Sequence, residues 1–199
     1  MTSDLLRLAT SEQLQRATAI LERAFGNDPL MHFMFPDPIE RAKRSPWYYA
    51  TNLKHSQLFG EVWTTADWSG VAAWLSPAED HWSFERLQQS GLWQMDEQLG
   101  DEATQRFMSV VALPTPATPK PYHYLFMLGV EPSQQGRGIG GRLLAPLLQR
   151  ADAEGAAIRV DTNDPANVRF YERHGFEIIF QTWVTPQLGQ WAFRREVVR

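Results

Sequence analysis

The chain has 199 residues with 19 basic and 23 acidic side chains, a net charge of −4, and no cysteine. This acidic balance argues against a nucleic-acid partner, which needs clustered positive charge, and the lack of cysteine excludes disulfides, thiolate metal sites and a cysteine acyl-enzyme. No stretch approaches the roughly 20 apolar residues of a membrane-spanning helix.

The first 75 residues alternate between strand and helix patterns. Ser11 is a good N-cap, and apolar residues at near-helical spacing after it predict a helix as far as Phe25, which residues 26–29 (Gly-Asn-Asp-Pro) end. The other elements expected here are a short strand at 5–8, an aromatic-rich helical region at 38–59, and paired strands at 61–65 and 71–75 joined by a turn built on Asp67 and Gly70.

Residues 76–121 differ in character from the rest of the chain. They are polar and aromatic, with helical spacing, and they end in the proline-rich stretch 114–121. A separate domain of this size is improbable, so we expect one domain over residues 1–199 in which 76–121 form an insertion on one face of the sheet, closed by a stiff loop.

The last third predicts strands and helices without regular repetition, which favours an α/β (α+β) fold with a mixed sheet. The expected elements are a strand at 122–130, a helix from about Gly136 to Glu154, a strand at 157–161, a helix that begins with the N-cap pair Asp164-Pro165, and a final strand pair at 177–185 and 190–197.

A glycine-rich loop follows the strand that ends in Val130, and it has two interpretations. Gly136, Gly138 and Gly141 satisfy the dinucleotide pattern G-x-G-x-x-G, with Asp161 twenty residues beyond. That pattern needs the strand to turn almost directly into the first glycine, whereas five residues intervene here, and only 58 residues follow Gly141. The second interpretation is therefore favoured.

Residues 135–140, Gln-Gly-Arg-Gly-Ile-Gly, fit Q/R-x-x-G-x-G/A, and residues 167–176 fit N-x-x-x-Y-x-x-x-G-F. In this order and spacing the two motifs resemble the acetyl-CoA-binding signature of the GCN5-related N-acetyltransferase (GNAT) superfamily. The resemblance implies a central twisted sheet of about seven strands, flanked by helices, with a splayed pair of parallel strands that holds the cofactor. It also implies transfer of acetyl from acetyl-CoA directly to a primary amine.

The resemblance also implies roles for single residues. Backbone amides of the glycine loop would surround the pyrophosphate of coenzyme A, and the Tyr171 phenol would protonate the departing thiolate as general acid. Arg137 either contacts a phosphate or is a solvated loop arginine. No metal is expected. The implied cofactor-binding residues are Leu128, Gly129, Val130, Gln135, Gly136, Arg137, Gly138, Ile139, Gly140, Gly141 and Asn167.

The chain departs from the superfamily at two positions. Several members carry a glutamate base six positions before the end of the strand, where this chain has Tyr124, so the base stays open among Asp161, His123, His81 and water. Many relatives carry Asn seven residues before the tyrosine, where Asp164 stands here; Asn163 or Asn167 would have to replace that contact.

Pieces at 24–29, 62–65, 71–77 and 121–130 also resemble the puromycin N-acetyltransferase branch. The resemblance leaves out most of the insertion, where we expect the acceptor to bind. Its aromatic residues, together with Trp74, suggest a small, aromatic or antibiotic-like amine; they are Trp82, Phe84 and Trp93. Acetylation of a protein or peptide amine and a non-catalytic acyl-CoA-binding module are the alternatives. We expect a cytoplasmic protein, because no signal peptide is evident, with a homodimer as an open possibility.

Overall fold

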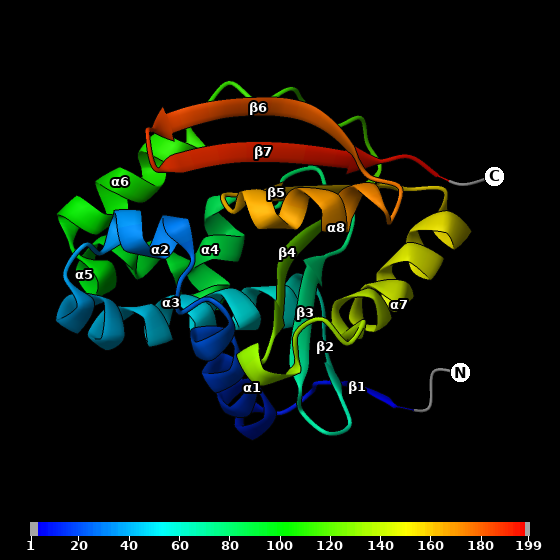
Figure 1. Ribbon diagram of the computed structural model, residues 1–199, viewed down its shortest axis with the longest axis horizontal. Helices are drawn as coiled ribbons and strands as arrows, with labels where there is room; N and C mark the ends of the chain where they lie inside the picture. Colours follow the sequence, from blue (N-terminus) through cyan, green and yellow to red (C-terminus); the bar gives the residue numbers. More distant parts are fainter. Residues whose placement is uncertain (1–3, 198–199) are drawn as a thin grey trace.

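The computed structural model describes residues 4–197. Its centre is a seven-stranded mixed sheet in the order β1-β2-β3-β4-β5-β7-β6 (Figure 1). The α/β fold class is therefore confirmed. The strands are β1 (Leu5–Arg7), β2 (Gly60–Thr65), β3 (Gly70–Leu75), β4 (Tyr122–Val130), β5 (Ala157–Thr162), β6 (Glu177–Thr185) and β7 (Leu188–Arg195).

One parallel pair, β4 with β5, stands in this otherwise antiparallel sheet. The two strands pair only from Tyr122 to Leu125, opposite Ala157 to Val160. Beyond that point β4 pairs with β3 alone, after a bulge at Phe126 that shifts the register. The last residues of β4 therefore separate from β5, as the predicted splayed pair requires, and their backbone groups on that side stay available to a ligand.

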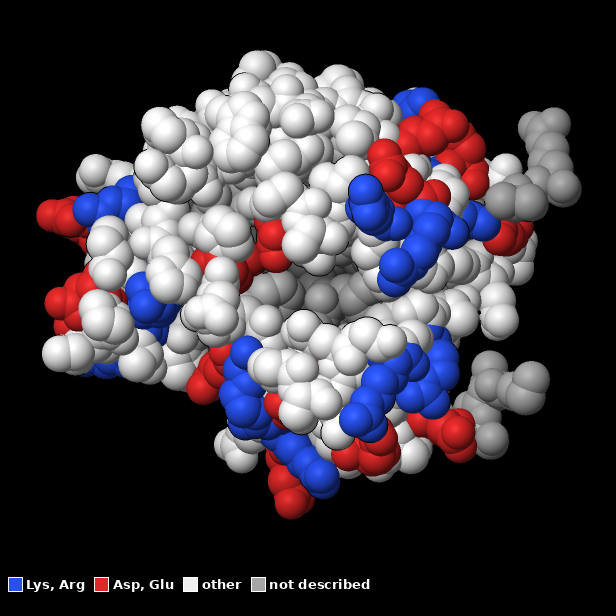
Figure 2. Space-filling model, in the orientation of Figure 1, with Lys and Arg blue, Asp and Glu red and all other residues white. Residues whose placement is uncertain are grey.

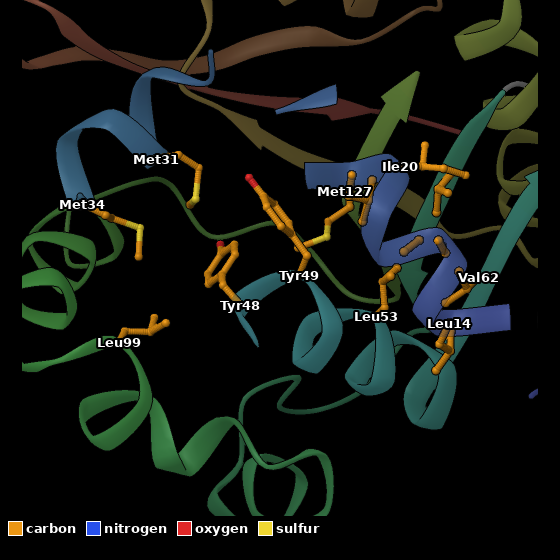
Figure 3. Close-up of a cluster of buried hydrophobic side chains, with 14 of the residues drawn as sticks. Leu14, Ile20, Met31, Met34, Tyr48, Tyr49, Leu53, Val62, Leu99 and Met127 are labelled. Atoms are coloured by element: carbon orange, nitrogen blue, oxygen red, sulfur yellow. The ribbon is translucent and has the colours of Figure 1, made fainter. Parts of the chain in front are cut away.

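Helices α1 (Ser11–Ala24) and α3 (Pro38–Phe59) cover one face of the sheet. Thr10, and not the predicted Ser11, is the N-cap of α1: its side chain accepts from the Gln13 amide while the Gln13 side chain returns to the backbone of Thr10. The apolar core of this face gathers Leu14 and Ile20 from α1 with the tyrosines of α3 (Figure 3). Burial of these side chains holds the two helices on the sheet.

A short helix that the sequence did not predict, α2 (Pro29–Met34), follows α1. The insertion then adds three helices against α2 and α3, followed by an irregular stretch with few regular contacts that returns the chain to β4. Its helical elements are α4 (Phe84–Ser90), η1 (Leu92–Gln94), α5 (Met95–Leu99) and α6 (Asp101–Val111). The insertion thus packs on the side of the sheet that α1 and α3 cover.

The opposite face is covered by α7 (Ile139–Glu154), with α8 (Val168–Glu172) beside it; the short turns η2 (Pro132–Gln134) and η3 (Pro165–Asn167) precede these helices. The predicted start of α7 at Gly136 is wrong by three residues. Gly136 and Gly138 have a φ of +76°, which a right-handed helix does not allow, so the helix begins only at Ile139. Within residues 4–197 no helix has both the length and the apolarity to cross a membrane. The cytoplasmic location stays a prediction.

Candidate active site

A cleft of about 580 Å³ opens where β4 and β5 separate, bounded by the start of α7, by α8 and by the connection between α1 and α2. In Figure 2 it is the central hollow, with Lys and Arg atoms on both sides of its right half and Asp and Glu atoms at its left. All the predicted cofactor-binding residues except Arg137 line it, and so does Tyr171. The fold therefore brings two distant sequence motifs to one cavity.

Unpaired backbone amides face this cleft at the start of α7. Within the described residues, no acceptor is found for the amides from Gly136 to Gly141, and no side chain caps the helix. A Cβ added at Gly136 or Gly138 would meet no atom within 4 Å. The loop thus offers open space, free donors and the positive end of a helix dipole, which together suit a phosphate group.

Gly140 and Gly141 lack a side chain for a different reason, which is close packing against α8. A Cβ at Gly140 would lie 3.1 Å from the Phe170 ring, and one at Gly141 would lie 2.9 Å from Nε2 of His174. These glycines let α7 approach α8 closely, so that the two motif helices form adjacent walls of the cleft.

Tyr171 is buried, with 6% of its surface exposed, and its ring packs against those of Phe170, Phe176 and Phe193. Its hydroxyl makes no hydrogen bond to any described residue, although the residue lines the cleft. Burial, followed by the negative charge of Asp161, raises the pKa of the phenol. The hydroxyl is therefore protonated at neutral pH and free to donate to a ligand.

Polar side chains at the mouth of the parallel pair are already engaged with the protein. Gln135 donates from Nε2 to the carbonyl of Val130 at 3.2 Å, and Asn167 donates from Nδ2 to Oγ1 of Thr162 at 3.1 Å. Asn163 turns away from the cleft and donates to the Gly189 carbonyl. Asp164 caps η3 by accepting from the Ala166 amide. Of the two asparagines, only Asn167 lines the cleft.

The basic groups of the cleft are not those expected from the motif. Arg137 is exposed and lies outside the lining, whereas Arg173 and Arg23 contribute to the wall. Arg173 lies over the Phe170 ring at 5.0 Å, and Arg23 forms an ion pair with Glu131. Neither arginine was identified from the sequence: Arg23 lies outside both motifs, and Arg173 stands at a variable position of the motif at 167–176, where the pattern specifies no side chain.

The predicted base candidates occupy three different environments. Asp161 accepts from the Tyr124 hydroxyl at 2.9 Å and forms an ion pair with Arg159 at 2.8 Å, and its charge acts on Tyr171. His81 is buried near Tyr124, where burial lowers its pKa. His123 lies at the far end of β4, about 23 Å along the strand from Val130, and burial lowers its pKa despite Glu154 at 2.9 Å. Only Asp161 acts electrostatically on Tyr171.

An aromatic cluster lies beside this carboxylate. Trp82 from the insertion packs edge-on against Tyr124 and Phe126, and it stacks on His55 at 5.1 Å. It is 40% exposed, so part of the indole faces solvent. Trp74 is fully buried in the core beneath α7, so the expectation that it lines an acceptor pocket is wrong.

The Acetyltransferase (GNAT) family profile matches residues 57–176, which include the glycine loop and Tyr171. The chain belongs to the GNAT family. The resemblance seen in the two motifs is therefore confirmed at the level of the family.

Individual GNAT relatives agree with this assignment. An uncharacterized N-acetyltransferase of Schizosaccharomyces pombe is 25% identical over 177 residues, 83% of this chain and 71% of that protein. A solved structure from Corynebacterium glutamicum, described as histone acetyltransferase HPA2 and related acetyltransferase, shares 19% identity with a TM-score of 0.72 and covers 98% of this chain and 97% of that one. The Drosophila melanogaster polyamine N-acetyltransferase reaches a TM-score of 0.54 at 14% identity over 98% and 100% of the two chains. The solved structures show the shared fold.

As a GNAT protein the chain is an N-acetyltransferase. Enzymes of this family generally use acetyl-CoA, and the cleft fits that donor because its amides are unpaired and its glycines leave room for phosphate. The puromycin N-acetyltransferase branch is not among these relatives and stays a prediction.

Proposed function

We propose that this GNAT protein transfers the acetyl group of acetyl-CoA directly to the primary amine of a small molecule. The observation that supports the proposal best is the joint placement of the unpaired α7 amides and the free Tyr171 hydroxyl on one cleft. The α7 amides suit a pyrophosphate, and the Tyr171 hydroxyl is a proton donor on the wall of the same cavity.

The chain supplies the donor site through its backbone. The amides from Gly136 to Gly141 bind the pyrophosphate, and Arg173 adds a positive charge at the cleft wall. The end of β4, which has no partner on β5, hydrogen-bonds the pantetheine arm. Bound there, acetyl-CoA supplies an activated acetyl group as a thioester.

Tyr171 acts as the general acid for the departing sulfur. Its raised pKa keeps the proton on the phenol at neutral pH, and the phenol donates it to sulfur as negative charge develops there during departure. The packing of its ring against Phe176 and Phe193 fixes the direction of the hydroxyl, so the proton is held in position without a hydrogen bond to the protein.

The acceptor side is built by the insertion and the strand beside it. Trp82, Tyr124 and Phe126 offer a partly exposed aromatic surface, and Asp161 lies next to it. Such a surface suits an amine attached to an aromatic or apolar body. The relative from Drosophila melanogaster is a polyamine N-acetyltransferase that forms N-acetylagmatine, so agmatine belongs in the first substrate panel beside alkylamines that carry an aromatic ring, such as phenethylamine.

Calorimetric titration with acetyl-CoA, with NADH in a parallel cell, tests the donor site, and release of free thiol in the presence of amines tests transfer. Tyr171→Phe should lower kcat by roughly 100-fold while the affinity for acetyl-CoA stays within about twofold. Tyr122→Phe is the matched control, because Tyr122 lies at the other end of β4 and does not line the cleft. A Tyr171→Phe protein at full rate would refute the assignment of the acid.

A further inference from the structure

Asp28 occupies a position in the cleft that its role in helix capping does not explain. It is the N-cap of α2 and accepts from the Met31 amide at 3.0 Å, and it lines the same cleft as Tyr171. Asp37 caps α3 in the same way before a proline, but there the carboxylate is exposed. Asn caps a helix as well as Asp does, so capping requires neither the charge of Asp28 nor its half-buried position.

No cation of residues 4–197 forms an ion pair with this carboxylate. Its hydrogen bond comes from a backbone amide, that of Met31. The titratable groups that face it are Tyr48 and Tyr49 from α3 and Asp164 before η3, none of them positive. Figure 3 shows both tyrosines projecting from α3 toward α2.

The surroundings therefore disfavour the charged form of this carboxyl. Burial, with a smaller contribution from Asp164, raises the pKa of Asp28 from 3.8 to about 6. Of the two arginines on the cleft wall, Arg23 is paired with Glu131 and Arg173 lies over the Phe170 ring. A positive group arriving from solvent would be the first cation to pair with Asp28.

We propose that Asp28 binds the ammonium group of the acceptor and takes its first proton, within the cleft that also contains Tyr171. This inference rests on the proposed function and names the substrate class more closely: an amine that enters as a cation. Asp28 and Tyr171 come from different elements, the α1–α2 connection and α8, so an acceptor nitrogen between them can lose a proton on one side while the leaving sulfur gains one on the other.

The protons balance in this scheme. A primary ammonium loses two protons when it becomes an amide, and the first passes to the Asp28 carboxylate, which exposes the nitrogen lone pair. As the carbon–nitrogen bond forms and the carbon–sulfur bond breaks, Tyr171 gives its proton to sulfur and regains the second proton from nitrogen. Asp28 then releases the first proton to solvent.

Asp28→Asn tests the proposal, because it removes the charge and keeps the helix cap. Asp37→Asn is the matched control at an exposed cap outside the cleft. With phenethylamine or agmatine as acceptor, Asp28→Asn should lower kcat/KM by roughly 100-fold and abolish the acidic limb of its pH profile. Wild-type kcat/KM with an unchanged acidic limb would overturn the proposal.

A second readout does not depend on turnover. The Met31 amide donates to Asp28, so its NMR shift reports the protonation of that carboxyl as pH changes. With coenzyme A present, phenethylamine should lower the midpoint of this titration by about half a unit or more, because a bound ammonium favours the carboxylate. A midpoint that does not move would overturn the proposal.

The two proposals fail in different ways. If the wild-type protein does not bind acetyl-CoA in the calorimeter, the proposed function is wrong. If it binds acetyl-CoA and acetylates an amine but Asp28→Asn does so equally well, the donor site stands and only the role of Asp28 is wrong.

Discussion

Replacement of Asp28 by Asn should stabilise the folded protein at neutral pH while it impairs the enzyme. The folded-state pKa of about 6 lies above the ordinary value of 3.8, so the folded protein binds this proton more tightly than the unfolded chain does. The stability that this protonation contributes is complete below pH 3.8 and is lost as the pH rises through 6. Asn does not titrate, so the Asp28→Asn protein does not lose this stability as the pH rises.

The magnitude follows from the two pKa values. Their difference corresponds to about 3 kcal/mol at full ionisation, of which about 1.4 kcal/mol is lost between pH 5 and pH 8. The favourable interaction of the carboxylate with the start of α2 is already contained in the folded-state pKa, so it adds no separate pH dependence. The free-energy advantage of Asp28→Asn over wild type should therefore grow with pH by about 1.4 kcal/mol.

Thermal unfolding of wild type, Asp28→Asn and Asp37→Asn at pH 5 and pH 8 measures this effect. For a chain of this length the Tm gap between Asp28→Asn and wild type should widen by about 3–6 °C from the lower to the higher pH. The gap for Asp37→Asn should stay constant within about 1 °C, because this carboxylate is exposed to solvent in the folded protein as well as in the unfolded chain. If the Asp28→Asn gap is the same at both pH values, the carboxyl does not titrate as its surroundings indicate.

Two further predictions concern the core and the donor site. The Leu143 side chain of α7 packs against β3 and β4 and has no exposed surface. Leu143→Ala should therefore lower the free energy of unfolding by about 2–5 kcal/mol in urea titrations. A loss below about 1 kcal/mol would contradict the packing described for α7. Arg173→Ala should weaken binding of coenzyme A about tenfold in the calorimeter, whereas Arg137→Ala should change it less than twofold; the reverse order would show that the motif arginine contacts the phosphates.

The donor half of the site could be predicted from the sequence because its signals are local. The strand at 122–130 and the helix-breaking glycines lie within one stretch of chain, and the geometry of positive φ at Gly136 and Gly138 depends on those residues themselves. Asp164-Pro165 was also identified as a cap in this way. Each inference needed only neighbouring residues.

Helix α2 was missed although its signal was present. Residues 26–29 were interpreted as the end of a helix, whereas Asp28-Pro29 is also the N-cap and first residue of the next one. The same pair at Asp37-Pro38 begins α3. A six-residue helix carries too short an apolar pattern for its period to be recognised, so the stop signal dominated the interpretation.

The acceptor half could not be predicted, because its residues meet only in the fold. Trp74 was placed with the acceptor aromatics, but every residue of β3 is buried, so the usual alternation of polar and apolar residues that would assign its face is absent. Asp28 lies outside both motifs, and Arg173 stands at a variable position of the motif at 167–176, which specifies no side chain there. Their place on the cleft depends on how α1 and α8 pack.

The distribution of charge in the cleft suits the two substrates that we propose. The start of α7 and two arginines line the cleft together with Asp28 and Asp164. In Figure 2 the Lys and Arg atoms flank the right half of the hollow, and Asp and Glu atoms lie at its left. A cationic amine is thereby attracted to one end and repelled from the other. Acetylation removes the positive charge on nitrogen, so the product no longer pairs with Asp28. The interaction that draws the acceptor in is thus lost in the product, and the cleft can release it without a change in the fold.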